Sequence, residues 1–116
     1  MSDFKIYHNP RCSKSRQTLA LLQQNGIEPE IVEYLTAPPS VKELMEVIKL
    51  LKVKPQDLMR KKEPEYKEAG LDNKDLSDKE QIKQMLAFPK VIERPIVIGN
   101  GKAVIGRPPE NVLDIL

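Results

Sequence analysis

The stretch FKIYHNPRCSKSRQTLALLQQNGIEPEIVEY, residues 4–34, decides the fold of this chain. Apolar and polar residues alternate over Phe4–Tyr7, which predicts a short strand. Residues 13–24 follow with leucines on one face, which predicts a helix. Residues 27–34 predict a second strand, in which Pro29 favours an early position or the edge of a sheet. A strand, a helix and a strand in this order call for a right-handed crossover and a parallel pair of strands.

The middle of the chain, roughly residues 40–87, has the patterns of helices. Ser40 and Glu43 fit a capping box, in which each side chain bonds the backbone N–H of the other residue. Apolar residues then recur at the i, i+3, i+4, i+7 spacing of an amphipathic helix. Ser77 and Glu80 repeat the capping box before another apolar run. We therefore expect a helical middle region.

Strand patterns return near the end of the chain. Residues 95–98 and 103–105 are apolar runs that flank Asn100-Gly101, and Asn-Gly between two such runs is the strongest short signal of a hairpin. Pro108-Pro109 then opens a last expected helix, because proline is favoured at the first helical position. The residues of that helix expected to face the core are apolar: Val112, Ile115 and Leu116.

These elements follow one another as β-α-β, a helical insertion, and β-β-α. This is the order of the thioredoxin fold, an α/β architecture with parallel and antiparallel pairings in one mixed four-stranded sheet. A chain of 116 residues supports one compact domain. We expect a single thioredoxin-like domain over residues 1–116, with the helical insertion at about 36–90.

Composition excludes several classes of function. The formal net charge of +2 is too small to indicate a nucleic-acid partner, and no apolar run approaches the roughly 18 residues of a membrane span. One cysteine and one histidine exclude an internal disulfide framework and most metal sites built from protein ligands. We expect no metal, no nucleic acid, no membrane, and a cytoplasmic location.

Cys12 is the candidate for chemistry. It lies just after the first expected strand, at the start of the first helix, where unpaired N–H groups and the helix dipole favour a thiolate. Arg11, Lys14 and Arg16 add positive charge around it. Cysteines in such surroundings have pKa values of roughly 3.5 to 7.5. The alternative is a small buried apolar residue, but a polar loop bounded by proline is a poor core position.

Ser15 stands where a Cys-x-x-Cys pair would have its second cysteine. Any adduct of Cys12 must therefore be resolved by a thiol from outside, such as glutathione. The Ser15 hydroxyl is expected either to bond the Cys12 sulfur or an incoming oxyanion, or to be an ordinary serine of the first helical turn. His8 either holds the Cys12 thiolate electrostatically or shuttles the proton of the Cys12 thiol, or it caps the strand end structurally.

Three arginines complete the candidate site. Arg94 precedes Pro95, which in this fold is expected to form a cis peptide bond and to face the start of the cysteine helix. Arg107 follows the hairpin, and Arg60 ends the short helix expected after Pro55. Each alone is most simply a surface charge. As a set around one thiolate they indicate an oxyanion site, because guanidinium groups bind tetrahedral oxyanions in a bidentate manner.

The sequence resembles the glutaredoxin-coupled arsenate reductases over essentially the whole chain. The stretches that carry the resemblance are His8–Arg16, Leu58–Lys61, Arg94–Val97, Gly106–Pro108 and Val112–Leu116.

The resemblance implies a role for each candidate residue. Cys12 matches the nucleophile of that family, and His8 and Ser15 match the histidine that lowers its pKa and the assisting serine. Its three anion-binding arginines match Arg60, Arg94 and Arg107.

The resemblance also implies a mechanism. Arsenate would dock on the arginines, and the Cys12 thiolate would attack arsenic to form a covalent sulfur–arsenic adduct. Glutathione would add next as co-substrate, glutaredoxin would supply the second thiol, and arsenite would leave. The implied enzyme holds no bound cofactor and takes its electrons from glutathione.

Two other classes of function compete with this interpretation. One is another glutathione-linked thiol oxidoreductase. The other is a redox regulator like the Spx proteins, which share this fold and bind RNA polymerase. Such regulators often have a Cys-x-x-Cys switch, which Ser15 removes here. The three arginines also favour anion chemistry over protein binding alone.

Overall fold

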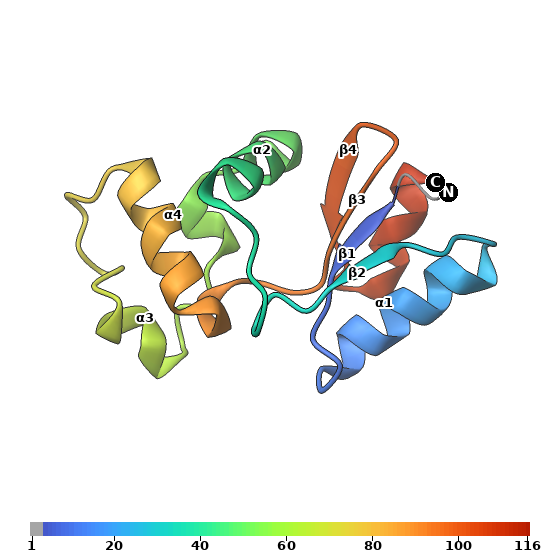
Figure 1. Ribbon diagram of the computed structural model, residues 1–116, viewed down its shortest axis with the longest axis horizontal. Helices are drawn as coiled ribbons and strands as arrows, with labels where there is room; N and C mark the ends of the chain where they lie inside the picture. Colours follow the sequence, from blue (N-terminus) through green and yellow to red (C-terminus); the bar gives the residue numbers. More distant parts are fainter. Residues whose placement is uncertain (1–3) are drawn as a thin grey trace. The chain divides into compact units, whose positions relative to one another are not determined.

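The computed structural model describes residues 4–116, which form two compact units (Figure 1). The first unit combines the chain up to Ala37 with Arg94–Leu116, and the second is Pro38–Glu93. The single domain with a helical insertion at about residues 36–90 stays a prediction. Within residues 4–116, no helix is both long enough and apolar enough to span a bilayer.

The first unit contains a mixed four-stranded sheet, as predicted. The strands lie in the order β2-β1-β3-β4, with β1 parallel to β2 and antiparallel to β3, and β3 antiparallel to β4. The elements of this unit, in chain order, are β1 Lys5–Tyr7, α1 Ser13–Gln24, β2 Glu30–Val32, β3 Ile96–Gly99, β4 Lys102–Ile105 and the 3-10 helix η3 Pro109–Ile115. The thioredoxin-like fold is thereby confirmed. The second strand is shorter than expected and lies at the edge, as Pro29 indicated.

The predicted hairpin joins β3 to β4 through Asn100 and Gly101. Both residues have positive φ, 54° and 72°, which is the backbone of the two-residue turn that Asn-Gly favours. The Asn100 side chain donates to the carbonyl of Ile115 at 2.7 Å and so ties the turn to η3. The last helix is therefore fixed at both the hairpin and the core.

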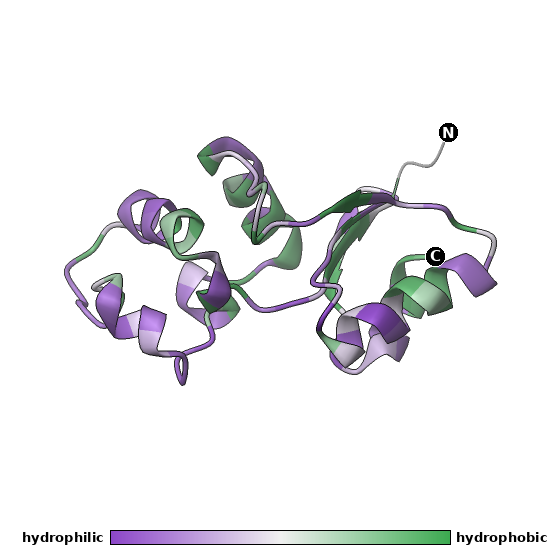
Figure 2. Cartoon of the chain, turned by 60° about the horizontal axis from the view of Figure 1, so that its bottom comes forward, coloured by the Kyte–Doolittle hydropathy of each residue, from purple (hydrophilic) through white to green (hydrophobic). Residues whose placement is uncertain are grey.

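The core of the first unit lies between the sheet, α1 and η3. Its buried residues are apolar and mostly aliphatic: Phe4, Ile6, Leu22, Val97, Val112 and Ile115. Figure 2 shows the strands of this unit coloured mostly as apolar. The prediction that Leu116 faces inward is wrong: it is 44% exposed, because η3 ends at Ile115 and Leu116 lies beyond its apolar face.

The second unit is helical. Its elements are α2 Val41–Leu51, the 3-10 helix η1 Pro55–Leu58, α3 Pro64–Glu68, α4 Asp78–Ala87 and the 3-10 helix η2 Pro89–Val91. The capping box of Ser77 and Glu80 forms in full, with bonds of 3.2 and 3.3 Å. At α2 the Ser40 hydroxyl accepts the Glu43 N–H at 3.1 Å, which is one half of the predicted box.

Candidate functional site

Cys12 is the N-cap residue of α1, at the end of a short loop that follows β1. Asn9 organises this loop: its side-chain Oδ1 accepts the Arg11 N–H at 3.0 Å, and its carbonyl accepts the Cys12 N–H at 3.0 Å. The Cys12 carbonyl in turn accepts the Arg16 N–H at 3.0 Å and begins the helix. The half-buried sulfur is thereby held at the N-terminal end of α1.

The pKa of the Cys12 thiol lies below its ordinary value. Burial raises this pKa, but the backbone N–H groups of Ser15 and Lys14 and the Arg94 guanidinium lower it by more. The N–H groups are the unpaired donors of the first helical turn, as the sequence predicted. The side-chain cation is Arg94 and not Arg11 or Lys14, because the fold brings the start of β3 beside the end of β1.

Arg16 also has a different place from the one expected. Its Nη1 donates to the Pro10 carbonyl at 2.9 Å, so this guanidinium supports the loop rather than the sulfur.

His8 and Ser15 form a buried hydrogen-bonded pair. The Nδ1 atom of His8 lies 2.6 Å from the Oγ of Ser15, and this hydroxyl also accepts the Asn9 N–H at 3.0 Å. The Ser15 hydroxyl thus bonds His8 and the loop, while the backbone N–H of Ser15 donates a hydrogen bond to the Cys12 sulfur. The pKa of His8 lies below its ordinary value because burial outweighs the opposing effect of the Glu33 carboxylate, and Arg16 lowers it further.

Arg94 and Arg107 meet at the base of the β3-β4 hairpin. The Nη1 of Arg107 donates to the Arg94 carbonyl at 3.4 Å, and the Gly106 N–H donates to the Pro95 carbonyl at 2.9 Å. Within residues 4–116, the buried Nε of Arg94 has no hydrogen-bond partner. The Arg94–Pro95 peptide bond is cis, which confirms that prediction, and the Arg107–Pro108 bond is cis as well.

Arg60 belongs to the second unit. It does not end the helix after Pro55 as predicted, because η1 ends at Leu58 and the backbone is already extended at Met59. The Nη1 of Arg60 pairs with Glu63 at 2.9 Å, and its backbone N–H donates to the carbonyl of Val91. The structure therefore brings Cys12, His8, Ser15, Arg94 and Arg107 together in the first unit. The part of Arg60 in anion binding stays a prediction.

Two residues that the sequence did not indicate, Thr18 and Gly106, pack against the elements that carry the site. Thr18 is fully buried, and its hydroxyl contacts the carbonyls of Lys14 at 2.8 Å and Gly106 at 3.3 Å. Gly106 leaves room for Pro95 and Thr18, since a Cβ there would lie 2.9 Å from Pro95 Cγ. A threonine inside a helix and a glycine after a strand carry no sequence signal for such a contact.

A hollow of about 400 Å³ lies beside the cysteine loop. Residues 8–11 form one wall, and Glu33, Leu35 and Thr36, which follow β2, form the other. It therefore offers one cation, Arg11, and one carboxylate, Glu33, beside apolar surface.

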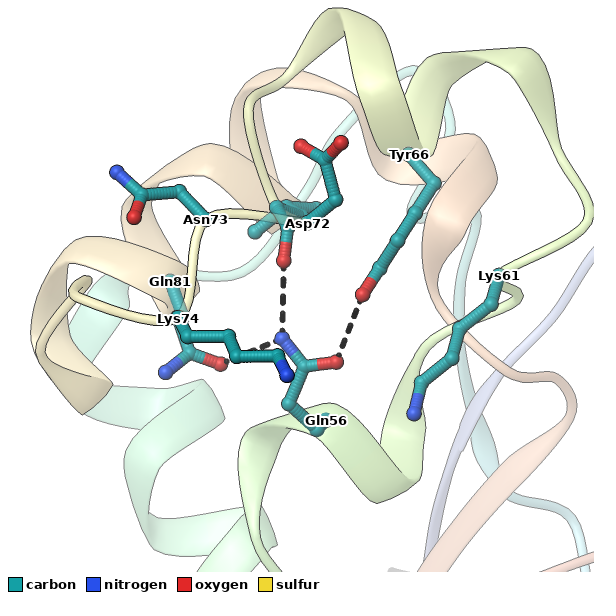
Figure 3. A pocket seen from close by; sticks show the side chains of 8 residues that line it. Gln56, Lys61, Tyr66, Asp72, Asn73, Lys74 and Gln81 are labelled. Atoms are coloured by element: carbon teal, nitrogen blue, oxygen red, sulfur yellow. Dashed lines mark hydrogen bonds between the residues drawn. The ribbon is translucent and has the colours of Figure 1, made fainter.

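A second hollow, of about 360 Å³, lies within the helical unit (Figure 3). Its floor is Gln56, whose Nε2 donates to the Leu71 carbonyl and to Gln81 Oε1, both at 3.1 Å. The Tyr66 hydroxyl donates to Gln56 Oε1 at 3.0 Å. Because these partly buried polar groups satisfy one another, they explain how η1, α3 and α4 are joined rather than indicating a ligand.

Comparison with known proteins finds similar sequences and structures that cover nearly the whole chain. The model of the ArsC family matches residues 7–115. The protein YfgD of Escherichia coli, which carries no assigned function in its name, is 54% identical over 97% of this chain and 95% of its own length. The arsenate reductase of Haemophilus influenzae is 53% identical over 96% of this chain and 97% of its own. The solved structure of an arsenate reductase from Vibrio cholerae superposes with a TM-score of 0.92 at 51% identity, covering 97% of each chain.

Proposed function

The chain belongs to the ArsC family, and we propose that, like its relatives named arsenate reductase, it reduces arsenate to arsenite. The observation that carries the proposal is the Cys12 sulfur at the start of α1, with Arg94 beside it and Arg107 beside Arg94. A thiolate next to guanidinium groups can attack a bound tetrahedral oxyanion.

The first step of the proposed reaction is a substitution at arsenic. Arsenate binds to Arg94 and Arg107, with the buried Nε of Arg94 as a donor that an anion oxygen would satisfy. Arg60 is the third proposed anion ligand. The Cys12 thiolate forms a sulfur–arsenic bond, one arsenic–oxygen bond breaks, and the oxygen leaves as water after protonation. No electrons are transferred in this step.

The reduction itself requires thiols from outside, because the chain has one cysteine. Glutathione forms a second sulfur–arsenic bond on the adduct, and another oxygen leaves as water. A glutaredoxin thiol then attacks the glutathione sulfur, so that two electrons pass to arsenic and a disulfide forms between glutathione and glutaredoxin. Water finally breaks the bond between Cys12 and the reduced arsenic, which releases arsenite and returns the Cys12 thiol. Overall, one arsenate and two thiols give one arsenite, one mixed disulfide and one water. These steps use no resident metal or prosthetic group, and their need for reduced glutathione favours a cytoplasmic location.

We assign His8 and Ser15 to positioning rather than to direct contact with arsenate. Their mutual hydrogen bond joins the end of β1 to the first turn of α1, and Cys12 lies between these two points. A lowered pKa keeps His8 neutral near pH 7, so the ring acts through its hydrogen bond and not as a fixed cation beside the thiolate.

The proposal is tested by coupled turnover. NADPH oxidation is followed through glutathione reductase, glutathione and glutaredoxin, with and without arsenate, and Cys12→Ser serves as the blank. We expect arsenate-dependent oxidation that the Cys12→Ser protein lacks. Lys102→Ala, an exposed change on β4, is the matched control and should keep full activity. Absence of arsenate-dependent turnover, with a reactive acidic thiol still present, would contradict arsenate reduction and favour another thiol substrate or a protein partner.

A further inference from the structure

The loop that holds Cys12 follows β1, and different strands lie on its two sides: β2 on one side and β3 on the other. Because β2 is parallel to β1, the end of β2 lies next to the end of β1. Because β3 is antiparallel to β1, the start of β3 lies on the other side of the same strand. Arg94 and Arg107 belong to the β3-β4 side. The hollow of about 400 Å³ lies on the β2 side, since Glu33, Leu35 and Thr36 follow β2.

The charges of this hollow match a zwitterion. Arg11 and Glu33 both line it, and neither forms an ion pair with another residue of the described part of the chain. Pro10 and Leu35 supply apolar surface between them. A ligand with an ammonium and a carboxylate on one carbon would pair with both side chains at once, whereas a simple anion such as arsenate would be repelled by Glu33.

We propose that this hollow binds the γ-glutamyl end of glutathione, with Glu33 on its ammonium and Arg11 on its α-carboxylate. The inference rests on the proposed function, to which it adds a docking site for the thiol co-substrate. The volume lies within the usual range of small-molecule sites, roughly 300 to 1,000 Å³. Cys12 directly follows Arg11, so a tripeptide anchored here extends its central thiol along the loop toward the adduct.

A consequence is that arsenate and glutathione occupy opposite flanks of one loop. Arsenate uses the arginines of the β3-β4 side, and the thiol approaches from the β2 side. The two therefore bind together without competing for the same cation. Removing Arg11 or Glu33 should raise the KM for glutathione and leave the KM for arsenate unchanged.

The direct test uses S-methylglutathione, which cannot react, as the probe for the full-length protein. Its binding is followed through backbone amide NMR signals, and we expect the largest shifts at His8, Arg11, Leu35 and Thr36. Arg11→Ala and Glu33→Gln should each weaken binding about tenfold, the loss of one charged hydrogen bond. Glu28→Gln and Lys102→Ala change exposed charges of the same unit and should leave the affinity unchanged. S-methylcysteinylglycine, which lacks the γ-glutamyl group, should bind weakly to all variants.

Unchanged affinity in both Arg11→Ala and Glu33→Gln, or shifts confined to the Arg94 side, would overturn the docking site. Both positions are exposed, so the variants are expected to fold, and thermal unfolding checks this. Because the probe is inert, binding is measured without arsenate turnover. Intact binding without turnover would contradict the proposed function alone, and turnover with unaltered glutathione KM in both variants would contradict the docking site alone.

Discussion

The Nδ1 atom of His8 lies 2.6 Å from the Oγ of Ser15, and both side chains are buried. This hydrogen bond connects the end of the central strand β1 to the first turn of α1. The Asn9 N–H, which donates to the same hydroxyl at 3.0 Å, fixes the loop between them. Cys12 is therefore positioned by a side-chain hydrogen bond that does not involve its sulfur.

We predict that His8 titrates below pH 6.5. Burial disfavours the imidazolium, and Arg16 does so too, while the Glu33 carboxylate opposes them. His8 is the only histidine in the sequence, so its ring signals in an NMR titration belong to one group. Glu33→Gln should lower the midpoint further, because it removes the carboxylate that favours the charged ring. A midpoint at or above 6.5 would contradict a buried neutral imidazole.

The same shift predicts a pH dependence of stability. Between the folded pKa of His8 and about 6.5, the unfolded chain binds more protons than the folded one. The contribution of His8 to the free energy of unfolding is thus fully present above about pH 6.5 and is lost as the pH falls. Urea unfolding at several pH values measures it, and His8→Gln should remove this part of the slope.

Ser15→Ala should lower the free energy of unfolding and also shift the alkylation midpoint of the Cys12 thiol. It leaves the Asn9 N–H and the His8 ring without their shared partner in a buried site, at a cost of about 1–3 kcal/mol. Ser13→Ala, an exposed change in the same helical turn, is the matched control and should cost far less. Urea unfolding gives the free energies, and iodoacetamide alkylation gives the thiol midpoint. If Ser15→Ala behaves like Ser13→Ala in both, the pair does not position the loop.

Arg94 and Arg107 should differ in their effects on the pKa of Cys12. Arg94→Ala should raise the midpoint of Cys12 alkylation, because Arg94 is the side chain that lowers the thiol pKa. Arg107→Ala should leave that midpoint near its wild-type position and should raise the KM for arsenate. Alkylation rates from pH 5 to 10, measured beside turnover, distinguish the two. In wild type the rate should fall as the pH drops through a pKa below the ordinary thiol value of about 8.5. Equal midpoint shifts in both variants would contradict this division.

Much of this architecture could be predicted from local sequence signals. Alternation, helical spacing and the Asn100-Gly101 turn act over a few residues, so they indicate the strands, α1 and the hairpin directly. The single cysteine at a helix start indicates a favoured thiolate for the same reason, since the unpaired N–H groups belong to its own turn.

Partners distant in sequence were harder to predict. The sequence indicated positive charge from Arg11, Lys14 and Arg16, the neighbours of Cys12 in the chain. The cation that lowers the thiol pKa is instead Arg94, more than 80 residues away in the sequence. Arg94 lies near Cys12 because β3 pairs with β1 in the sheet. The Ser15 hydroxyl bonds His8, which is only seven residues away, but the partner depends on how the loop between β1 and α1 turns, and no local pattern indicates that turn.

Gly106→Ala tests whether such distant packing controls the thiol. A Cβ at Gly106 would lie 2.6 Å from Thr18 Oγ1 and 2.9 Å from Pro95 Cγ, so both neighbours, or the backbone of residue 106, must move. Overpacking of this kind costs about 1–3 kcal/mol. Because Arg94 directly precedes Pro95, displacement of the proline should also move the guanidinium and raise the alkylation midpoint of Cys12.

Gly70→Ala provides a control for the loss of stability itself. Gly70 has a φ of 71° and open space around its Cα, so alanine there strains the backbone of the second unit without a clash. Both variants should lower the free energy of unfolding, but only Gly106→Ala should shift the thiol midpoint. A shift of the same size in Gly70→Ala would mean that general destabilisation, and not the contact between Gly106 and Pro95, governs the reactivity of Cys12.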